Sequence, residues 1–382
     1  MPTGRLAFID QLRTVLTVLV IAHHTAITYG GSGGWFYREV TDGGAPFSLL
    51  LTLFCSVNQA FFMGMFFLLA GYFTPPALAA KGLRRFVADR LLRLGLPLLV
   101  FGFVLGPLTV ALAGTQQGRA FWPRWWQLVS EGRFVIGPLW FAWALLLFTA
   151  AWLAWRAWHP APPPPAPPPP ATPLPATAAP VPGDRAWLLA ALGVGAAALA
   201  IRQVVPVGEN RWGLQLGYFA SYIFLFMLGT VAWRHRWLER VHRAQARRWG
   251  RVALYTVPLL VATAAATGAM AGKPVDFNGG LGVAAVVYAF WEPFVAWGVI
   301  ARLVVGFRDR PGPPSPRWAG WNANAYGAFI LHAPVITGLA VALAGWGAPP
   351  ALKFALVLAA GTALSFTLAG WLKRLPGAGR VL

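Results

Sequence analysis

Two adjacent histidines, His23 and His24, lie inside the first long apolar run of this 382-residue chain. An ionisable side chain within an apolar run of membrane-spanning length is costly and by default marks a functional site. Neutral imidazole can act as a base near pH 7, so it could take a proton from a hydroxyl group. The alternative is a buried histidine that a neighbouring side chain satisfies. Because consecutive residues of a helix point about 100° apart, only one of the two can face a given site.

Arg90 and Arg93 form a second candidate, because they enter another apolar run with an i,i+3 spacing. On an α-helix this spacing puts both guanidinium groups on one face, where they can hold phosphate groups. Arg13 precedes His24 by eleven residues and is expected at the same membrane surface. His24 then lies roughly 16 Å deeper, about half the hydrocarbon thickness. Anchoring to lipid headgroups is the alternative role for such a basic segment.

A third candidate is a set of polar residues near the middle of other apolar runs, namely Asn58, Glu292 and His332. They fall at the depth expected of His24, where polar groups must pair or line a cavity. Glu292 and His332 are therefore expected to orient His24 or a bound acceptor, the alternative being hydrogen bonds that only hold helices together. Asp10 is excluded as a direct partner of His24, because fourteen helical residues span roughly 21 Å.

The elements that position these residues are expected to be transmembrane helices. Hydrophobic residues make up 57% of the chain and charged residues only 11%, against about 25% charged in soluble domains. The predicted fold class is an all-α polytopic membrane protein with about ten transmembrane helices and both termini cytoplasmic. The expected spans are 11–30, 46–74, 91–113, 138–158, 186–204, 212–233, 250–271, 279–303, 322–345 and 350–372.

The formal net charge of +20 follows the same topology. Most lysines and arginines fall in the segments predicted to face the cytoplasm, which is the positive-inside pattern, so nucleic-acid binding is rejected. No cleavable signal peptide is evident, and Cys55, the only cysteine, excludes a disulfide within the chain and a thiolate metal cluster. No metal cofactor is expected.

Residues 1–382 are expected to form a single membrane domain that contains a Pro/Ala-rich cytoplasmic linker at 160–184. Such a composition favours a polyproline II spacer, and a docking site for a partner is the alternative. The short outer loops leave 31–45 and 114–137 as the main extracytoplasmic surface outside the spans. Within the second of these, the aromatic run 121–126 is expected to anchor at the membrane interface, or to stack on a sugar.

Five stretches, taken in chain order, resemble the acyltransferase 3 family of integral membrane acyltransferases. They are Ile9-Asp10-Gln11-Leu12-Arg13 with His24 eleven residues beyond, 61–73, 89–97, 137–141 and 326–332. Each motif is weak alone, but together they cover essentially the whole chain, and ten spans is the family's architecture. The chain departs from the pattern at Ala70, where the family often has serine, and it has no appended esterase-like domain.

The resemblance implies a multi-pass enzyme of the bacterial inner membrane, surrounded by membrane lipid. It would transfer an acyl group, acetyl or succinyl, from cytoplasmic acyl-CoA to a hydroxyl of an extracytoplasmic carbohydrate or glycolipid. Among acyl-CoA donors, acetyl-CoA is the co-substrate expected first. His24 would be the general base or a transient acyl carrier, with Glu292 and His332 assisting. Arg90, Arg93 and Arg13 would hold the phosphates of CoA.

Two other classes of function stay open at this point. A transporter or flippase of a small or glycan-linked substrate also places ionisable groups in the membrane, although no inverted repeat supports it. A non-catalytic membrane scaffold would use the Pro-rich linker for docking.

Overall fold

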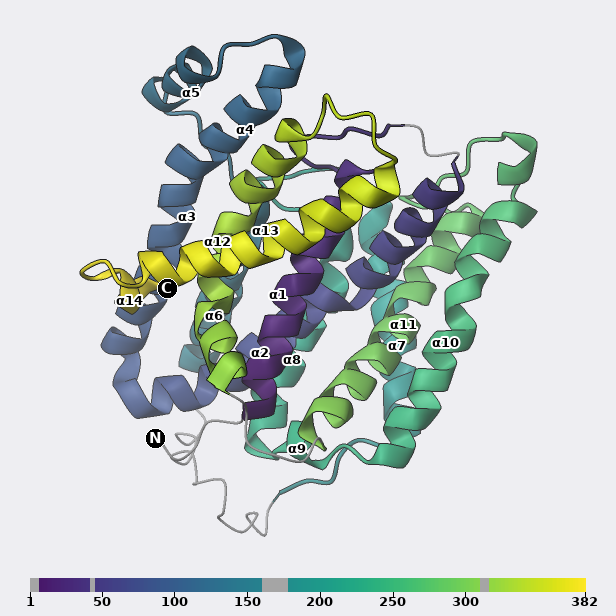
Figure 1. Ribbon diagram of the computed structural model, residues 1–382. Helices are drawn as coiled ribbons and strands as arrows, with labels where there is room; N and C mark the ends of the chain where they lie inside the picture. Colours follow the sequence, from purple (N-terminus) through teal and green to yellow (C-terminus); the bar gives the residue numbers. More distant parts are fainter. Residues whose placement is uncertain (1–6, 42–44, 160–177, 310–315) are drawn as a thin grey trace. The chain divides into compact units, whose positions relative to one another are not determined.

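The computed structural model describes residues 7–41, 45–159, 178–309 and 316–382 (Figure 1), so most of the predicted linker at 160–184 lies outside the described residues. The described part of the chain is all-α and contains no β-strand, only an isolated bridge between Arg211 and Leu214. The α-helices are α1 (Ala7–Thr28), α2 (Pro46–Arg90), α3 (Leu96–Val100), α4 (Gly106–Gly114), α5 (Phe121–Ser130), α6 (Trp140–Trp158), α7 (Asp184–Arg202), α8 (Phe219–Arg234), α9 (Trp237–Arg240), α10 (Arg243–Ala266), α11 (Val283–Arg308), α12 (Pro316–Ala342), α13 (Pro350–Leu372) and α14 (Ala378–Val381).

Eight helical segments of the described residues are long and apolar enough to cross a membrane. The longest, Pro46–Gln117, covers two predicted spans, so these eight segments account for nine of the ten predictions. The remaining prediction, 11–30, corresponds to α1, which is a continuous helix but is not among the eight. Asp10, Arg13 and the histidine pair interrupt its apolar sequence. The protein is therefore an all-α polytopic membrane protein.

The long segment Pro46–Gln117 differs from the prediction, because its helix continues through the residues expected to form a loop. Gly82 interrupts α2 with a φ of +70°, a left-handed backbone that glycine adopts without a steric penalty. Beyond α2 the chain forms two π-helical turns, η1 (Leu91–Gly95) and η2 (Phe101–Leu105). A π-turn holds more residues than an α-turn, so the α-helical spacing assumed for Arg90 and Arg93 does not apply to this segment.

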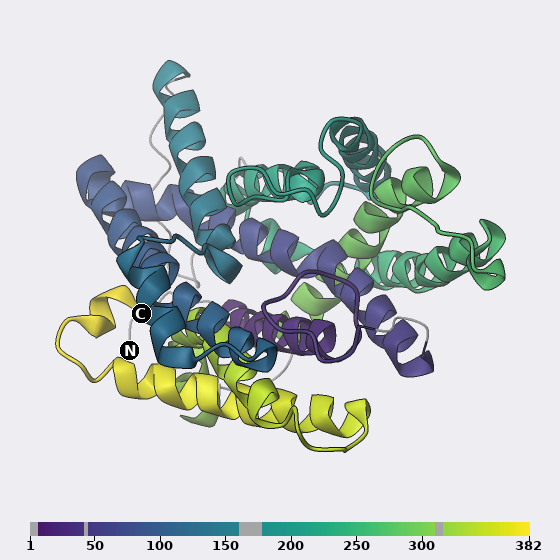
Figure 2. The same cartoon turned by 90° about the horizontal axis from the view of Figure 1, so that it is seen from above.

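The described chain divides into two compact units, each built from separated stretches. Unit 2 comprises 13–58, 84–147 and 313–382. Within it, α12 and α13 lie side by side, as Figures 1 and 2 both show, and α12 also packs against α4. Buried residues of α1, α12 and α13, among them Ile21, Ala328 and Val357, share one hydrophobic cluster. This packing brings α1 and α12, which are distant in sequence, against each other.

Unit 1 comprises 1–12, 59–83 and 148–312. In it α10 lies along α11, and α7 packs against both α11 and α8 (Figure 1). The crossing of α2 and α8 depends on small residues: a Cβ atom at Gly71 would overlap the Phe226 carbonyl, and one at Gly229 would overlap the Leu68 carbonyl. Close approach of backbones through small residues is a common way for helices to associate in membranes.

Candidate active site

His24 and His332 are joined by a hydrogen bond between His24 Nδ1 and His332 Nε2, 2.9 Å apart. Their rings are nearly parallel, with centroids 5.1 Å apart and planes inclined by 11°. His24 comes from α1 and His332 from α12, whose contact is reinforced by a hydrogen bond from Thr14 to Asn322. The predicted proximity of His24 and His332 is thus confirmed, and it lies entirely within unit 2.

The second nitrogen of His332 determines which nitrogen of His24 is available for chemistry. His332 Nδ1 lies 2.6 Å from the backbone carbonyl of Phe329, which can only accept a hydrogen bond, so Nδ1 carries the proton. In neutral His332 the other nitrogen, Nε2, is then an acceptor, and His24 Nδ1 must donate to it. Neutral His24 is consequently left with an unprotonated Nε2. A backbone carbonyl thus selects the tautomers of two successive imidazoles.

The indole of Trp35 lies flat on the imidazole of His24, with ring centroids 3.8 Å apart and planes inclined by 11°. Sequence reasoning selected the segment 31–45 as outer surface but did not single out Trp35. The chain turns back after α1 at Gly30 and Gly33, which have φ values of +117° and +133°. Val40 then donates from its backbone to the Thr28 carbonyl, which closes the loop over the end of α1.

Two further contacts fasten this loop. Lys353 of α13 forms a 2.5 Å ion pair with Glu39, and both side chains are largely buried. Tyr37 packs against the hydrophobic cluster of unit 2, and burial and the nearby Glu39 carboxylate raise its pKa. The loop that carries Trp35 is therefore held by backbone, charge and packing, so the stacked position of Trp35 is well defined.

His23 and Asn58 occupy positions different from that of His24. His23 is buried and meets the His24 ring edge-on, with centroids 5.5 Å apart. Asn58 donates to the backbone carbonyl of Leu19, 3.2 Å away, and so binds α2 to α1. His24 is the more exposed of the two histidines and is the one bonded to His332. This agrees with the expectation that only one of the pair faces the site.

The three arginines predicted to hold phosphate groups all belong to unit 2. Arg90 is half-buried, with its guanidinium 5.2 Å from the centre of the Phe86 ring, and it lies within reach of the positive charge of Arg13. Arg93 is exposed and donates from Nε to the Arg380 carbonyl at 3.3 Å. Arg13 and His24 lie on the same continuous helix, which separates them by roughly 16 Å along its axis.

Glu292 has a partner that the sequence did not suggest. In unit 1 it forms a buried ion pair with Arg202, whose side chain is fully buried. Arg202 also donates from Nε to the Gly217 carbonyl at 3.0 Å, and its guanidinium lies over the ring of Tyr288. The expectation for Glu292 rested on depth alone, and depth does not specify which neighbour a side chain faces.

The described residues contain no cluster of three or more histidine, cysteine or acidic side chains that could hold a metal ion. The chemistry available at His24 is that of an imidazole base in an apolar environment, stacked on an indole. Such a base can take a proton from a hydroxyl group without a metal ion.

Comparison with known proteins identifies the family to which this chain is similar. A family model described as an acyltransferase domain, that of acyltransferase 3, matches residues 6–370. Glucans biosynthesis protein C of Salmonella gallinarum is 27% identical over 170 residues, covering 42% of this chain and 41% of the relative. The same protein of Salmonella heidelberg is 27% identical over 168 residues, covering 41% of this chain and 40% of the relative.

The matched region thus spans about two fifths of these curated relatives. No solved structure matches the chain. The family match favours an acyltransferase over a transporter, because it extends over nearly the whole chain and includes both histidines and all three arginines. The chain belongs to the acyltransferase 3 family of membrane proteins.

Proposed function

We propose that this protein is a membrane O-acyltransferase of the bacterial inner membrane. It moves an acyl group, acetyl or succinyl, from cytoplasmic acyl-CoA to a hydroxyl of an extracytoplasmic carbohydrate or glycolipid. The observation that carries the proposal is the hydrogen-bonded series from the Phe329 carbonyl through His332 to His24, within a chain of the acyltransferase 3 family. Curated relatives named for glucan biosynthesis support a carbohydrate acceptor.

The unprotonated Nε2 of His24 is the proposed general base. It takes the proton of the acceptor hydroxyl as the oxygen attacks the thioester carbonyl carbon of the donor. A new C–O bond forms and the C–S bond breaks. The departing thiolate takes the proton from Nε2, which yields the acyl ester and CoA and restores the neutral imidazole.

His332 is proposed as a positioning residue, because it holds the Nδ1 proton of His24 and so keeps Nε2 free. When His24 becomes protonated, Nε2 of His332 still accepts its Nδ1–H, and the Trp35 ring lies over the positive charge, a favourable cation–π arrangement. Glu292 is proposed to assist through structure, because loss of its carboxylate would leave the buried Arg202 charge without that partner.

The phosphate groups of the donor are assigned to Arg13, Arg90 and Arg93. Arg13 and Arg90 are both half-buried and lie within electrostatic reach of each other, so together they offer positive charge to an anion. The roughly 16 Å between Arg13 and His24 along α1 is the distance that the acyl-bearing arm must cover.

The experiment that tests the proposal measures transfer from radiolabelled acetyl-CoA or succinyl-CoA to glucose oligosaccharides by the purified full-length protein. We expect His24→Ala to lower the rate by about 10²- to 10⁴-fold, the usual contribution of a general base. His23→Ala is the matched control, and it should retain most of the activity. Full activity in folded His24→Ala protein would remove this residue from the mechanism.

Binding of CoA tests the phosphate site separately. Arg90→Ala and Arg93→Ala should each weaken CoA binding measured by calorimetry, whereas Arg84→Ala, which removes an exposed arginine of α2, should not. Equal CoA affinity in all three variants would show that the phosphates bind elsewhere.

A further inference from the structure

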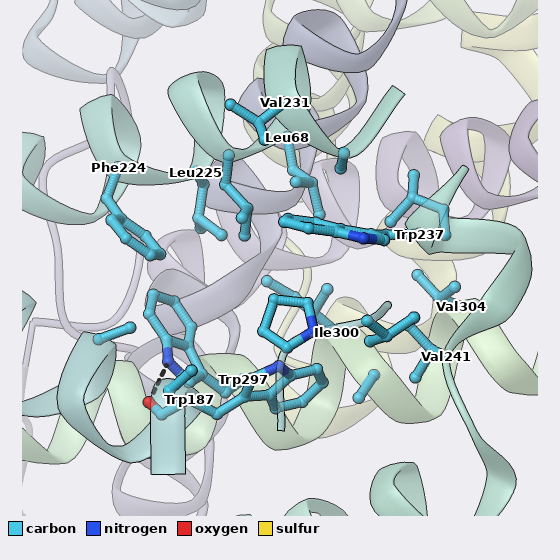
Figure 3. Close-up of a pocket in the computed structure, with 18 of the residues that line it drawn as sticks. Leu68, Trp187, Phe224, Leu225, Val231, Trp237, Val241, Trp297, Ile300 and Val304 are labelled. Atoms are coloured by element: carbon cyan, nitrogen blue, oxygen red, sulfur yellow. Dashed lines mark hydrogen bonds between the residues drawn. The ribbon is translucent and has the colours of Figure 1, made fainter. Parts of the chain in front are cut away.

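Unit 1 contains a cavity of about 430 Å³ that is separate from the residues assigned to acyl transfer. Its volume falls within the range of about 300–1,000 Å³ that is usual for small-molecule sites. Its walls come from α7, α8, α9 and α11, and Figure 3 shows Trp187, Phe224, Trp237 and Trp297 around it. It therefore has the size of a binding site for a ligand.

The lining of this cavity is apolar throughout, although it includes several tryptophans. The indole N–H of Trp297 donates to the Trp187 carbonyl at 3.2 Å, the bond drawn in Figure 3, and that of Trp237 donates to the Ala179 carbonyl at 3.2 Å. The backbone thus uses both of these donors, and the accessible surface of the cavity is almost entirely carbon. An occupant gains nothing by bringing a polar group into the cavity, so a hydrocarbon chain fits it best.

The position of the cavity among the membrane helices identifies the source of such a hydrocarbon chain. Three of its walls, α7, α8 and α11, belong to segments that can span a membrane. Val231 and Met227 line the cavity from α8, yet each is more than a third exposed, so the cavity opens at a surface that these helices present to lipid. The acyl chains of membrane lipid are the hydrocarbon present there.

Two arginines that stand in the sequence between lining residues of the cavity indicate the headgroup. Arg185 directly precedes the lining residue Ala186 in the first turn of α7, and Arg234 follows Val231 by one turn at the end of α8. Because α7 and α8 are consecutive, packed helices, the start of one lies beside the end of the other. Both arginines are exposed, and neither forms an ion pair with another described residue.

Neighbouring charges are already paired. Asp184 binds Arg248, and Arg236 binds Glu239, so neither acidic group is left to neutralise the two arginines. We propose that this cavity binds one acyl chain of an anionic phospholipid, whose phosphate is held by Arg185 and Arg234. The site is a lipid-binding site of unit 1, and it does not depend on the proposed acyl transfer.

The test measures lipid that stays bound to the purified full-length protein. The protein is incubated with equal amounts of phosphatidylglycerol and phosphatidylcholine and analysed by native mass spectrometry. We expect one tightly bound phosphatidylglycerol per chain. Ala190→Trp, which fills the cavity from a partly exposed position on α7, should lower its occupancy at least about tenfold.

Ala196→Trp is the matched control, because Ala196 is exposed on the same helix and does not line the cavity. It should leave lipid binding unchanged. Val231→Trp fills the cavity from a more exposed position and should act as Ala190→Trp does, so a folding defect in one variant does not decide the result. Unchanged phosphatidylglycerol in both filled variants would overturn the proposal.

A second set of variants tests how the two arginines contribute to lipid binding. Arg185→Gln with Arg234→Gln should abolish the preference for phosphatidylglycerol over phosphatidylcholine. Arg251→Gln, on α10, which contributes no lining residue, should preserve that preference. Equal binding of the two lipids by the wild-type protein would overturn the assignment of an anionic headgroup.

Discussion

Removal of Glu292 should destabilise the protein through Arg202 rather than through lost catalysis. The Arg202 side chain is 0% exposed and that of Glu292 is 5% exposed, so Glu292→Met leaves a guanidinium charge buried without its carboxylate. Breaking a buried pair by removing one partner costs about 3–5 kcal/mol of the free energy of unfolding. Replacing both partners by apolar residues of similar volume is often neutral or stabilising, so Arg202→Met with Glu292→Met should recover most of that loss.

The assay is unfolding of each variant in detergent by denaturant, alongside the acyl-transfer rate of the folded fraction. We expect the single variant to be strongly destabilised and the double variant to be close to the wild-type protein in both stability and rate. A double variant as unstable as the single variant would refute the ion-pair account. A stable double variant without acyl transfer would instead return Glu292 to the catalytic site.

Two further predictions concern unit 1. Gly71→Ala should lower the free energy of unfolding by about 1–3 kcal/mol, because its Cβ would overlap the Phe226 carbonyl. Gly193→Ala is the control, because Gly193 has open space around it, and it should not destabilise the protein. Thermal unfolding of both variants checks this prediction. Burial, followed by neighbouring arginine charges, lowers the pKa of His235 below its usual 6.5, and its Nδ1 accepts a hydrogen bond from the Ala179 backbone. This contribution to stability is present above pH 6.5 and is lost as pH falls through the lowered pKa, so His235→Asn, which keeps an acceptor but does not titrate, should reduce the fall in melting temperature on acidification. An equal fall in both proteins would contradict the assignment.

The membrane class and most helices could be predicted because they depend on composition and on the length of apolar runs. The pairing of His24 with His332 was also accessible, since polar groups in a membrane must find partners and both residues fall at one depth. The same reasoning could not find Arg202 for Glu292, because it placed Arg202 at the outer end of the expected span 186–204 and Glu292 near the middle of the expected span 279–303. Depth along a span does not specify direction around the helix.

Two features of the site depend on local backbone that hydropathy does not encode. The π-helical turn η1 alters the spacing of Arg90 and Arg93, and no residue type in this segment predicts a π-turn. Trp35 reaches His24 because the loop turns at Gly30 and Gly33 and is held by the pair of Glu39 with Lys353. The partner of Glu39 is more than 300 residues away, so the loop conformation could not be derived locally.

The proposed chemistry requires an unprotonated Nε2 on His24, set by His332. The most direct test is ¹⁵N magnetic resonance of histidine-labelled protein in lipid bilayers at neutral pH. The chain has six histidines, and comparison with the His24→Gln variant identifies the signal of His24. The account predicts that Nδ1 of His24 carries the proton, that Nε2 does not, and that His332→Ala produces a mixture of tautomers. A proton on Nε2 of His24 in the wild-type protein would contradict the account.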